Sequence, residues 1–140
     1  MIIKILYTLL LNIYIVLLFY FIMIPEKEVE LIENPEEISK IINEKIKNKR
    51  LIFTDWYKMG IMRKGISEEK FNEIFPQFEK IKRIEKETLK FGDIGYELFY
   101  KFSNNTQYSI GTIPNKKYLK IIHLIEYKRS LEKRFKKFKK

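Results

Sequence analysis

Few side chains in this chain of 140 residues have the types that chemistry needs. His123 is its one histidine, and cysteine is absent. A histidine cluster, a Cys/His pair and a thiolate metal site are therefore excluded, so a metal would have to bind through carboxylates alone. Gly92 and Gly95 fit neither of the glycine-rich phosphate-binding patterns. We predict no cofactor and no metal site.

His123 stands inside an apolar run, between Ile122 and Leu124. A histidine can act as a general base near neutral pH, but in such a run it is more simply interpreted as a packed or partly exposed strand residue. Most carboxylates fall on predicted helix surfaces, where solvated charge explains them. We also expect Trp56 to belong to the core. These residues favour a domain that binds a partner and has no catalytic site.

The elements that must position these residues begin with residues 5–24, a run of twenty without a charge. A helix of that length spans about 30 Å, close to the hydrocarbon thickness of a bilayer. A cleaved signal would need a shorter apolar stretch that ends in small residues, but the chain has no alanine and the run ends in Met23, Ile24 and Pro25. A buried core helix would show a polar face. We therefore predict a transmembrane anchor over residues 1–25, with the side of the membrane unassigned.

Charge and length divide the remainder of the chain. Residues 26–115 have balanced charge, whereas residues 116–140 hold 11 basic and two acidic residues, so the net charge of +10 belongs mainly to the C-terminal end. The length leaves room for one domain with a modest core. We predict a juxtamembrane linker and helix over 26–50, a small domain over 51–129 and a basic C-terminal helix over 130–140.

Capping residues predict three short helices. They begin at Asn34, Thr54 and Ser67, where a side-chain oxygen can accept from a free N–H of the first turn. Apolar residues at helical spacing are expected to pack inward from each helix. In chain order, these are Ile38, Ile41, Ile42 and Ile46; then Trp56, Met59 and Met62; then Phe71, Ile74 and Phe75.

Alternation and β-branched or aromatic residues predict strands. A short one is expected at 51–53, and a meander at 81–89, 96–102, 107–113 and 118–127. The polar turns between the last three favour hairpins. The predicted fold class is α+β, with a transmembrane helix followed by two or three short helices packed on a sheet of three or four antiparallel strands.

The C-terminal segment places Leu131, Phe135 and Phe138 at helical spacing among basic residues. Either this helix docks its apolar stripe on the sheet and leaves its lysines solvated, or it adheres to a surface of negative charge. Anionic lipid headgroups and RNA phosphates would both attract it. The residues expected to make such contacts are Lys133, Arg134, Lys136, Lys137, Lys139 and Lys140.

The stretch DWYKMGIMRKGISEEKFNEIF, residues 55–75, resembles the helical opening of BrnT-type proteins of the RelE/ParE-like toxin superfamily. The later segments YSIGTI, 108–113, and KIIHLIEYKR, 120–129, extend this resemblance, which covers residues 51–129. It implies a ribonuclease fold in which basic residues and a histidine or tyrosine assist attack by the RNA 2′-hydroxyl. The positions that match are Arg63, Lys64, His123, Tyr127 and Arg129.

From the sequence we expect a single-pass protein, anchored in a lipid bilayer through residues 5–24, that presents a small α+β interaction domain. A RelE/BrnT-like ribonuclease and an RNA-binding adaptor that uses the basic tail are the alternatives.

Overall fold

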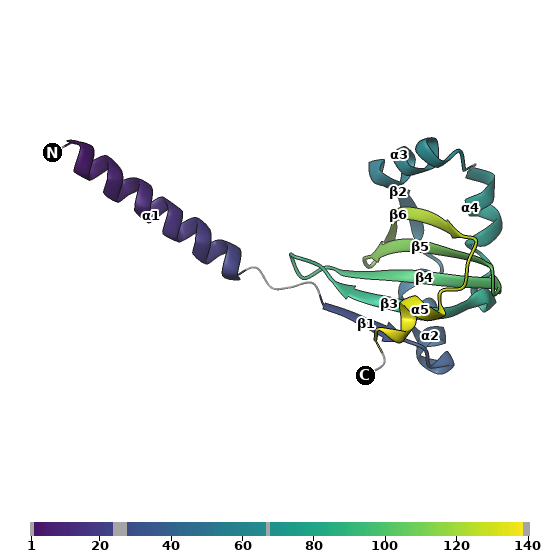
Figure 1. The fold of residues 1–140 in the computed structure, drawn as a ribbon. Coiled ribbons are helices and arrows are strands. Elements are labelled where there is room, and N and C mark those ends of the chain that lie inside the picture. The colour runs from purple at the N-terminus through teal and green to yellow at the C-terminus, as the bar shows by residue number, and fades with distance from the viewer. Residues whose placement is uncertain (1, 24–27, 67, 139–140) are drawn as a thin grey trace.

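The computed structural model describes residues 2–23, 28–66 and 68–138, and it contains one mixed sheet with helices on both faces and a separate N-terminal helix (Figure 1). In chain order, the elements are α1 (Ile2–Met23), β1 (Glu28–Ile32), α2 (Pro35–Ile41), the π-helical turn η1 (Ile42–Ile46), β2 (Arg50–Phe53), α3 (Asp55–Lys64), α4 (Glu68–Ile74), the 3-10 turn η2 (Phe78–Lys80), β3 (Ile81–Thr88), β4 (Ile94–Ser103), β5 (Thr106–Pro114), β6 (Tyr118–Tyr127) and α5 (Glu132–Lys136).

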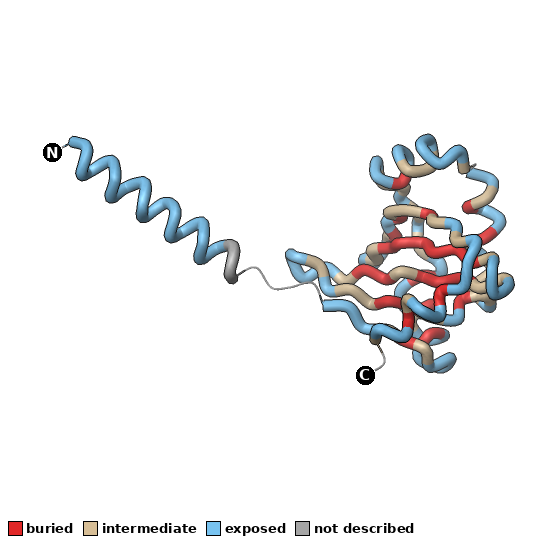
Figure 2. The backbone as a smooth tube through the Cα atoms, viewed as in Figure 1, coloured by how far each residue is buried: buried red, intermediate tan, exposed pale blue. Residues whose placement is uncertain are grey.

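Helix α1 is long and apolar enough to cross a membrane over Ile2–Tyr20, and none of that stretch is buried in the structure. Figure 2 shows Ile2–Tyr20 exposed, whereas the sheet carries most of the buried residues. Neither of the two hydrophobic clusters includes a described residue of α1. The α+β domain therefore has a core of its own.

The sheet has six strands in the order β1-β3-β4-β5-β6-β2. The predicted count of three or four antiparallel strands was wrong in two respects. The stretch expected to be a linker forms β1, which pairs antiparallel to β3, and β2 pairs parallel to β6. The meander β3-β4-β5-β6 is antiparallel throughout, as the alternation predicted.

Strand β1 pairs in a register that complements its charges. Glu30 lies opposite Lys86, and Ile32 lies opposite Ile84, where both isoleucines are buried. Cross-strand pairs of opposite charge and pairs of apolar residues each stabilise an antiparallel ladder. One acidic residue of the stretch expected to be a linker is thus matched by a basic residue on the neighbouring strand.

The helices begin and end where the capping residues indicated. Asn34 Oδ1 accepts from the backbone N–H groups of Glu36 and Glu37, and Thr54 Oγ1 accepts from that of Tyr57. Gly65 ends α3 at φ 65°, a left-handed conformation that glycine adopts without a steric penalty. The predicted cap at Ser67 lies outside the described residues.

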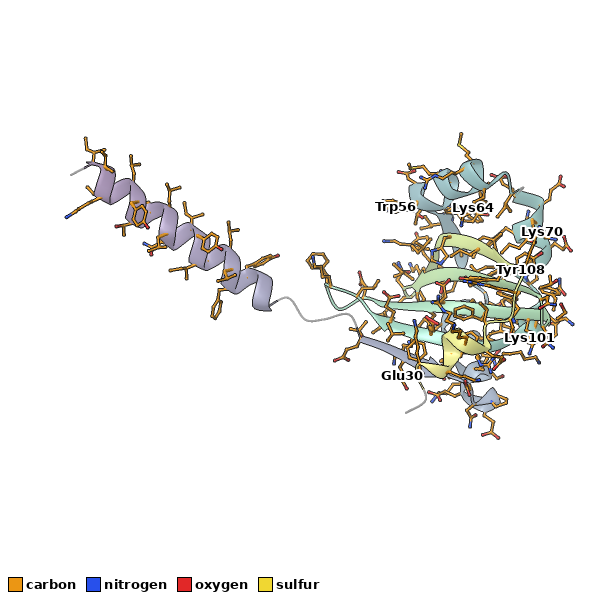
Figure 3. The ribbon with its side chains drawn as sticks, viewed as in Figure 1. Glu30, Trp56, Lys64, Lys70, Lys101 and Tyr108 are labelled. Carbon is orange, nitrogen blue, oxygen red and sulfur yellow. The ribbon has the colours of Figure 1, made fainter. Side chains whose placement is uncertain are left out.

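Helix α3 turns a different face to the sheet from the one predicted. Tyr57 is buried and Ile61 packs against the core, whereas Trp56 is 75% exposed and Met62 is 83% exposed. The assignment of Trp56 to the core was therefore wrong. Figure 3 labels Trp56 and Lys64 on this helix. The cap at Thr54 sets the phase of α3, because its hydroxyl also donates to Ile121 O at 2.9 Å and ties the first turn to β6.

The main core lies between the sheet and α2, η1, α3 and α4. Tyr96, Leu98 and Tyr100 share the buried face of β4, as the alternation predicted. Tyr100 donates from its hydroxyl to Phe75 O at 2.9 Å. We call this side of the sheet the helix face, and the other side, which carries Phe99 and Tyr127, the open face.

Helix α5 covers one part of the open face. Leu131 and Phe135 are buried there, and the Phe135 ring meets the Phe99 ring edge-on at 5.0 Å between centroids. The helix is only five residues long, shorter than the predicted helix over 130–140, and Lys139 and Lys140 lie outside the described residues. The C-terminal segment was interpreted either as a helix docked on the sheet or as a helix that adheres to a negatively charged surface. The docked helix explains its apolar stripe.

Candidate functional site

A hollow of about 420 Å³ lies on the open face, between the strands and α5. Its charged and polar lining comes from four separate elements, β3, β4, β6 and α5 with the residues that follow it. These lining residues are Glu85, Glu87, Glu97, His123, Tyr127, Arg134 and Lys137. Such a convergence of titratable groups in one concavity marks the candidate site.

Glu97 and His123 form a pair across the sheet. Nε2 of His123 lies 2.6 Å from Oε1 and 2.8 Å from Oε2 of Glu97, although β5 runs between their two strands. The register places Gly111 between them. A Cβ atom at Gly111 would lie 2.7 Å from His123 Nε2 and 3.0 Å from Glu97 Oε2, so a side chain at that position would have to displace the pair.

The pairing fixes how His123 can react. An ionised carboxylate only accepts hydrogen bonds, so Nε2 carries the proton that it donates to Glu97. In the neutral imidazole the lone pair is then on Nδ1, which makes no hydrogen bond within the described part of the chain. A carboxylate that orients an imidazole in this way is the arrangement of a general base. The His123 side chain is 36% exposed, so a ligand can reach it.

Glu85 and Arg134 form the second pair in the hollow. Glu85 is only 7% exposed, and its two oxygens accept from Nε and the terminal Nη2 of Arg134 at 3.0 and 2.9 Å. This bidentate pair joins α5 to β3, and it raises the pKa of Arg134. The guanidinium also lies 5.4 Å from the centroid of the Phe99 ring.

The remaining polar groups complete the wall of the hollow. The Tyr127 hydroxyl lies 3.3 Å from Ser109 Oγ, which is fully buried on β5. Lys137 is exposed at the rim and lies 5.3 Å from the centroid of the Phe138 ring. The hollow thus offers an imidazole, a hydroxyl pair and two cationic groups beside three carboxylates, a set suited to a small polar ligand.

The structure brings two of the five residues implied by the toxin resemblance into this hollow. These are His123 and Tyr127. Lys64 lies on α3, where its Nζ is 3.5 Å from Leu124 O, and Arg63 is exposed on the same helix. Arg129 is exposed between β6 and α5. The five residues that match the toxin family therefore lie partly on the open face and partly on other surfaces.

Among the predicted contact residues of the tail, Arg134 is held by Glu85, whereas Lys133, Lys136 and Lys137 are exposed. Sequence reasoning missed Glu85 because dense charge in β3 gave it no distinguishing pattern, and it missed Glu97 because that carboxylate's partner comes from another strand. Gly111 within an alternating strand was the one available signal, since a glycine there marks a close approach of other groups.

Comparisons with models of protein families, with curated proteins and with solved structures find nothing that matches this chain.

Proposed function

We propose that the chain is a single-pass membrane protein in which α1 anchors a small α+β interaction domain at a bilayer surface. One observation carries this proposal: the apolar window of α1, Ile2–Tyr20, is long enough to cross a membrane and has no buried residue. So much apolar surface in water is unfavourable, and a bilayer removes all of it from water. The separate core of the domain supports a division between anchor and domain.

Alkaline carbonate extraction tests the anchor. The full chain should stay in the membrane pellet at its full mass, and Leu11→Arg with Ile15→Arg should release it. Each arginine costs about 2.5–3.5 kcal/mol at the centre of a spanning helix. The control is Leu11→Ile with Ile15→Leu, which keeps the helix apolar. Release of the unaltered chain, or a mature chain that begins beyond Met23, would refute the anchor.

The domain supplies the interaction in this proposal. Its open-face hollow binds a small polar ligand, and the exposed lysines of α5, with Lys137 after it, are contacts for anionic lipid headgroups or RNA. Because Phe135 and Arg134 hold α5 on the sheet, deletion of the tail would disturb the fold. The test is the neutral triple variant Lys133→Gln, Lys136→Gln and Lys137→Gln. RNA binding through these lysines would fall steeply as salt rises and would weaken in the variant; salt-insensitive binding excludes it.

A ribonuclease of the RelE/BrnT-like kind is the second candidate, and the Glu97–His123 pair favours it. With Nδ1 as base, His123 could take the proton of an RNA 2′-hydroxyl as that oxygen attacks the phosphorus, while the 5′-oxygen leaves with a proton from water and Lys137 faces the phosphate. The hollow includes His123 and excludes Arg129. We therefore expect RNA cleavage or growth arrest by the full chain to be lost in His123→Ala and kept in Arg129→Ala. Absence of both effects in the unaltered chain would exclude this function.

A further inference from the structure

The end of the sheet where β1 begins follows α1 after a short stretch of chain. Only residues 24–27 separate Met23 from Glu28, and even a fully extended chain of that length spans no more than about 18 Å. If α1 crosses a bilayer, as proposed above, the start of β1 lies within that distance of the membrane surface. Under that proposal, this end of the domain is held near lipid.

The β3–β4 hairpin projects from this same end. Glu28 lies opposite Thr88, the last residue of β3, so residues 89–93 extend beyond the start of β1 (Figure 1). Two to three residues of extended chain advance the tip by about 7–10 Å. The tip is therefore the part of the domain that reaches farthest along the direction from which the tether enters.

Phe91 at this tip is 89% exposed, the most exposed large apolar side chain in the described part of the chain. Its turn is well defined, since Leu89 N–H donates to Asp93 O at 2.8 Å and Gly92 N–H donates to Leu89 O at 3.1 Å. Gly92 has a φ of 84°, which favours glycine. Phe91 is thus presented by an ordered turn, so little conformational freedom remains to be lost on binding.

Basic side chains gather at the same end on the β2–β6 side. The β5–β6 turn lies there, because Pro114 is opposite Leu119 and Arg50 is opposite Tyr118. The cluster consists of Lys45, Lys49, Arg50, Lys116 and Lys117, with Glu44 beside it. Lys49 donates to Asn115 O, and burial together with the charge of Lys45 lowers the pKa of Lys49.

We propose that this end of the domain is a lipid-binding surface: Phe91 enters the interfacial region of the bilayer that α1 crosses, and the basic cluster contacts anionic headgroups. The inference rests on the anchor proposed above. Removing one phenylalanine side chain from water favours insertion by on the order of tenfold, and each basic residue near an anionic surface adds about fivefold. Such contacts are weak for a free protein, but the tether keeps the local concentration of lipid high.

The acids at this end set the orientation. Glu28 and Glu30 on β1 are repelled by an anionic surface, whereas the basic cluster is attracted; in the β3–β4 turn, Lys90 and Asp93 carry opposite charges. Because β1 and β2 are the two edges of the sheet, the domain should lean toward its β2–β6 side. Membranes with more anionic lipid should therefore draw the domain closer.

The chain's one tryptophan makes a direct test possible, because Trp56→Phe leaves no other tryptophan fluorescence. The full chain with Trp56→Phe and Phe91→Trp is placed in vesicles of phosphatidylcholine, with or without phosphatidylglycerol, whose acyl chains are brominated. The control is Trp56→Phe with Asn105→Trp, which labels the β4–β5 turn at the opposite end of the sheet. Asn105 is exposed and has no positive φ, so tryptophan fits there.

We expect at least twofold stronger quenching for Phe91→Trp than for Asn105→Trp, and a further increase with phosphatidylglycerol. Lys116→Gln with Lys117→Gln should remove that increase. Lys101→Gln, at the far end of β4 in Figure 3, should leave it unchanged. Equal quenching at the two turns, in vesicles that still float with the protein, overturns this inference and leaves the anchor intact. Protein that does not float with vesicles overturns the anchor, and this inference with it.

Discussion

Gly111 lies between Glu97 and His123, so the methyl group of an alanine at this position would push the two side chains apart. A Cβ there would lie 2.7 Å from His123 Nε2, so Gly111→Ala must displace the imidazole or bend the strand. We expect a loss of about 1–3 kcal/mol in the free energy of unfolding, which is typical of overpacking. Urea denaturation measures it.

Gly60→Ala is the matched control for that substitution. Gly60 lies within α3 and has nothing within 4 Å of its Cβ position, so alanine should stabilise the domain by about 0.5–1 kcal/mol. Effects of the same sign at both glycines would contradict the close approach of His123 to Gly111.

Tyr57 and Tyr100 are both buried, but only one hydroxyl has a partner. Tyr57 Oη finds no hydrogen bond among the described residues, whereas Tyr100 donates to Phe75 O. An unsatisfied buried polar group is unfavourable, so Tyr57→Phe should leave the domain unchanged or about 1 kcal/mol more stable, and Tyr100→Phe should cost about 1 kcal/mol. Thermal or urea unfolding of the two variants compares them directly, and a loss at Tyr57 equal to that at Tyr100 would show that its hydroxyl is bonded.

The same burial makes the contribution of Tyr57 to the stability of the domain depend on pH. Burial, with the charge of Glu68, raises the pKa of Tyr57 from 10.0 to about 12. The folded state therefore favours the neutral phenol. Its contribution to stability is complete below pH 10 and is lost as the pH rises through 12. Tyr57→Phe should lose less stability than the unaltered domain between pH 10 and 12, and an identical decline would contradict the raised pKa.

The docking of helix α5 on the sheet depends mainly on Phe135, although most residues of the helix are charged. Phe135 is buried between the Phe99 ring and the Arg83 guanidinium, whose carbon lies 4.5 Å from the ring centroid. We expect Phe135→Ala to cost about 3–5 kcal/mol and Phe138→Ala, which is only half-buried, to cost less than about 1 kcal/mol. Urea denaturation distinguishes the two. Similar small losses would mean that α5 is not docked.

Elements specified by local signals could be predicted from the sequence. The caps at Asn34 and Thr54 and the alternation in β4 are of this kind. Strand β1 could not be predicted, because its pairing with Lys86 and Ile84 joins residues more than fifty positions apart. The inward face of α3 depends on the tertiary bond from Thr54 to Ile121, so local periodicity alone assigned Trp56 to the wrong side.

The candidate site was predictable only in part for the same reason. His123 and Tyr127 drew attention by residue type and by the toxin resemblance. Their partners Glu97 and Ser109 come from other strands, and the pair of Glu85 with Arg134 spans 49 positions. A site assembled from the register of a sheet leaves little trace in any one segment.

At the scale of the whole molecule, helix α1 and the α+β domain should be energetically independent. Within the described residues, the clusters that stabilise the domain take no member from α1, whose apolar window is fully exposed. Removal of residues 2–23 should therefore change the free energy of unfolding of the domain by no more than about 0.5 kcal/mol, since distant sites without shared contacts act additively. Urea denaturation of both chains in the same detergent micelles measures the difference.

Ile32→Ala, placed in both chains, calibrates that comparison. Ile32 is 3% exposed in the main core, so its truncation should cost about 2–4 kcal/mol whether or not α1 is present. Equal losses would show that β1, which follows the tether directly, packs the same way in both chains. A larger loss without α1, or a shortened chain that fails to fold, would mean that α1 supports the fold of the domain in addition to its proposed role as an anchor, because the packing of β1 would then depend on the preceding helix.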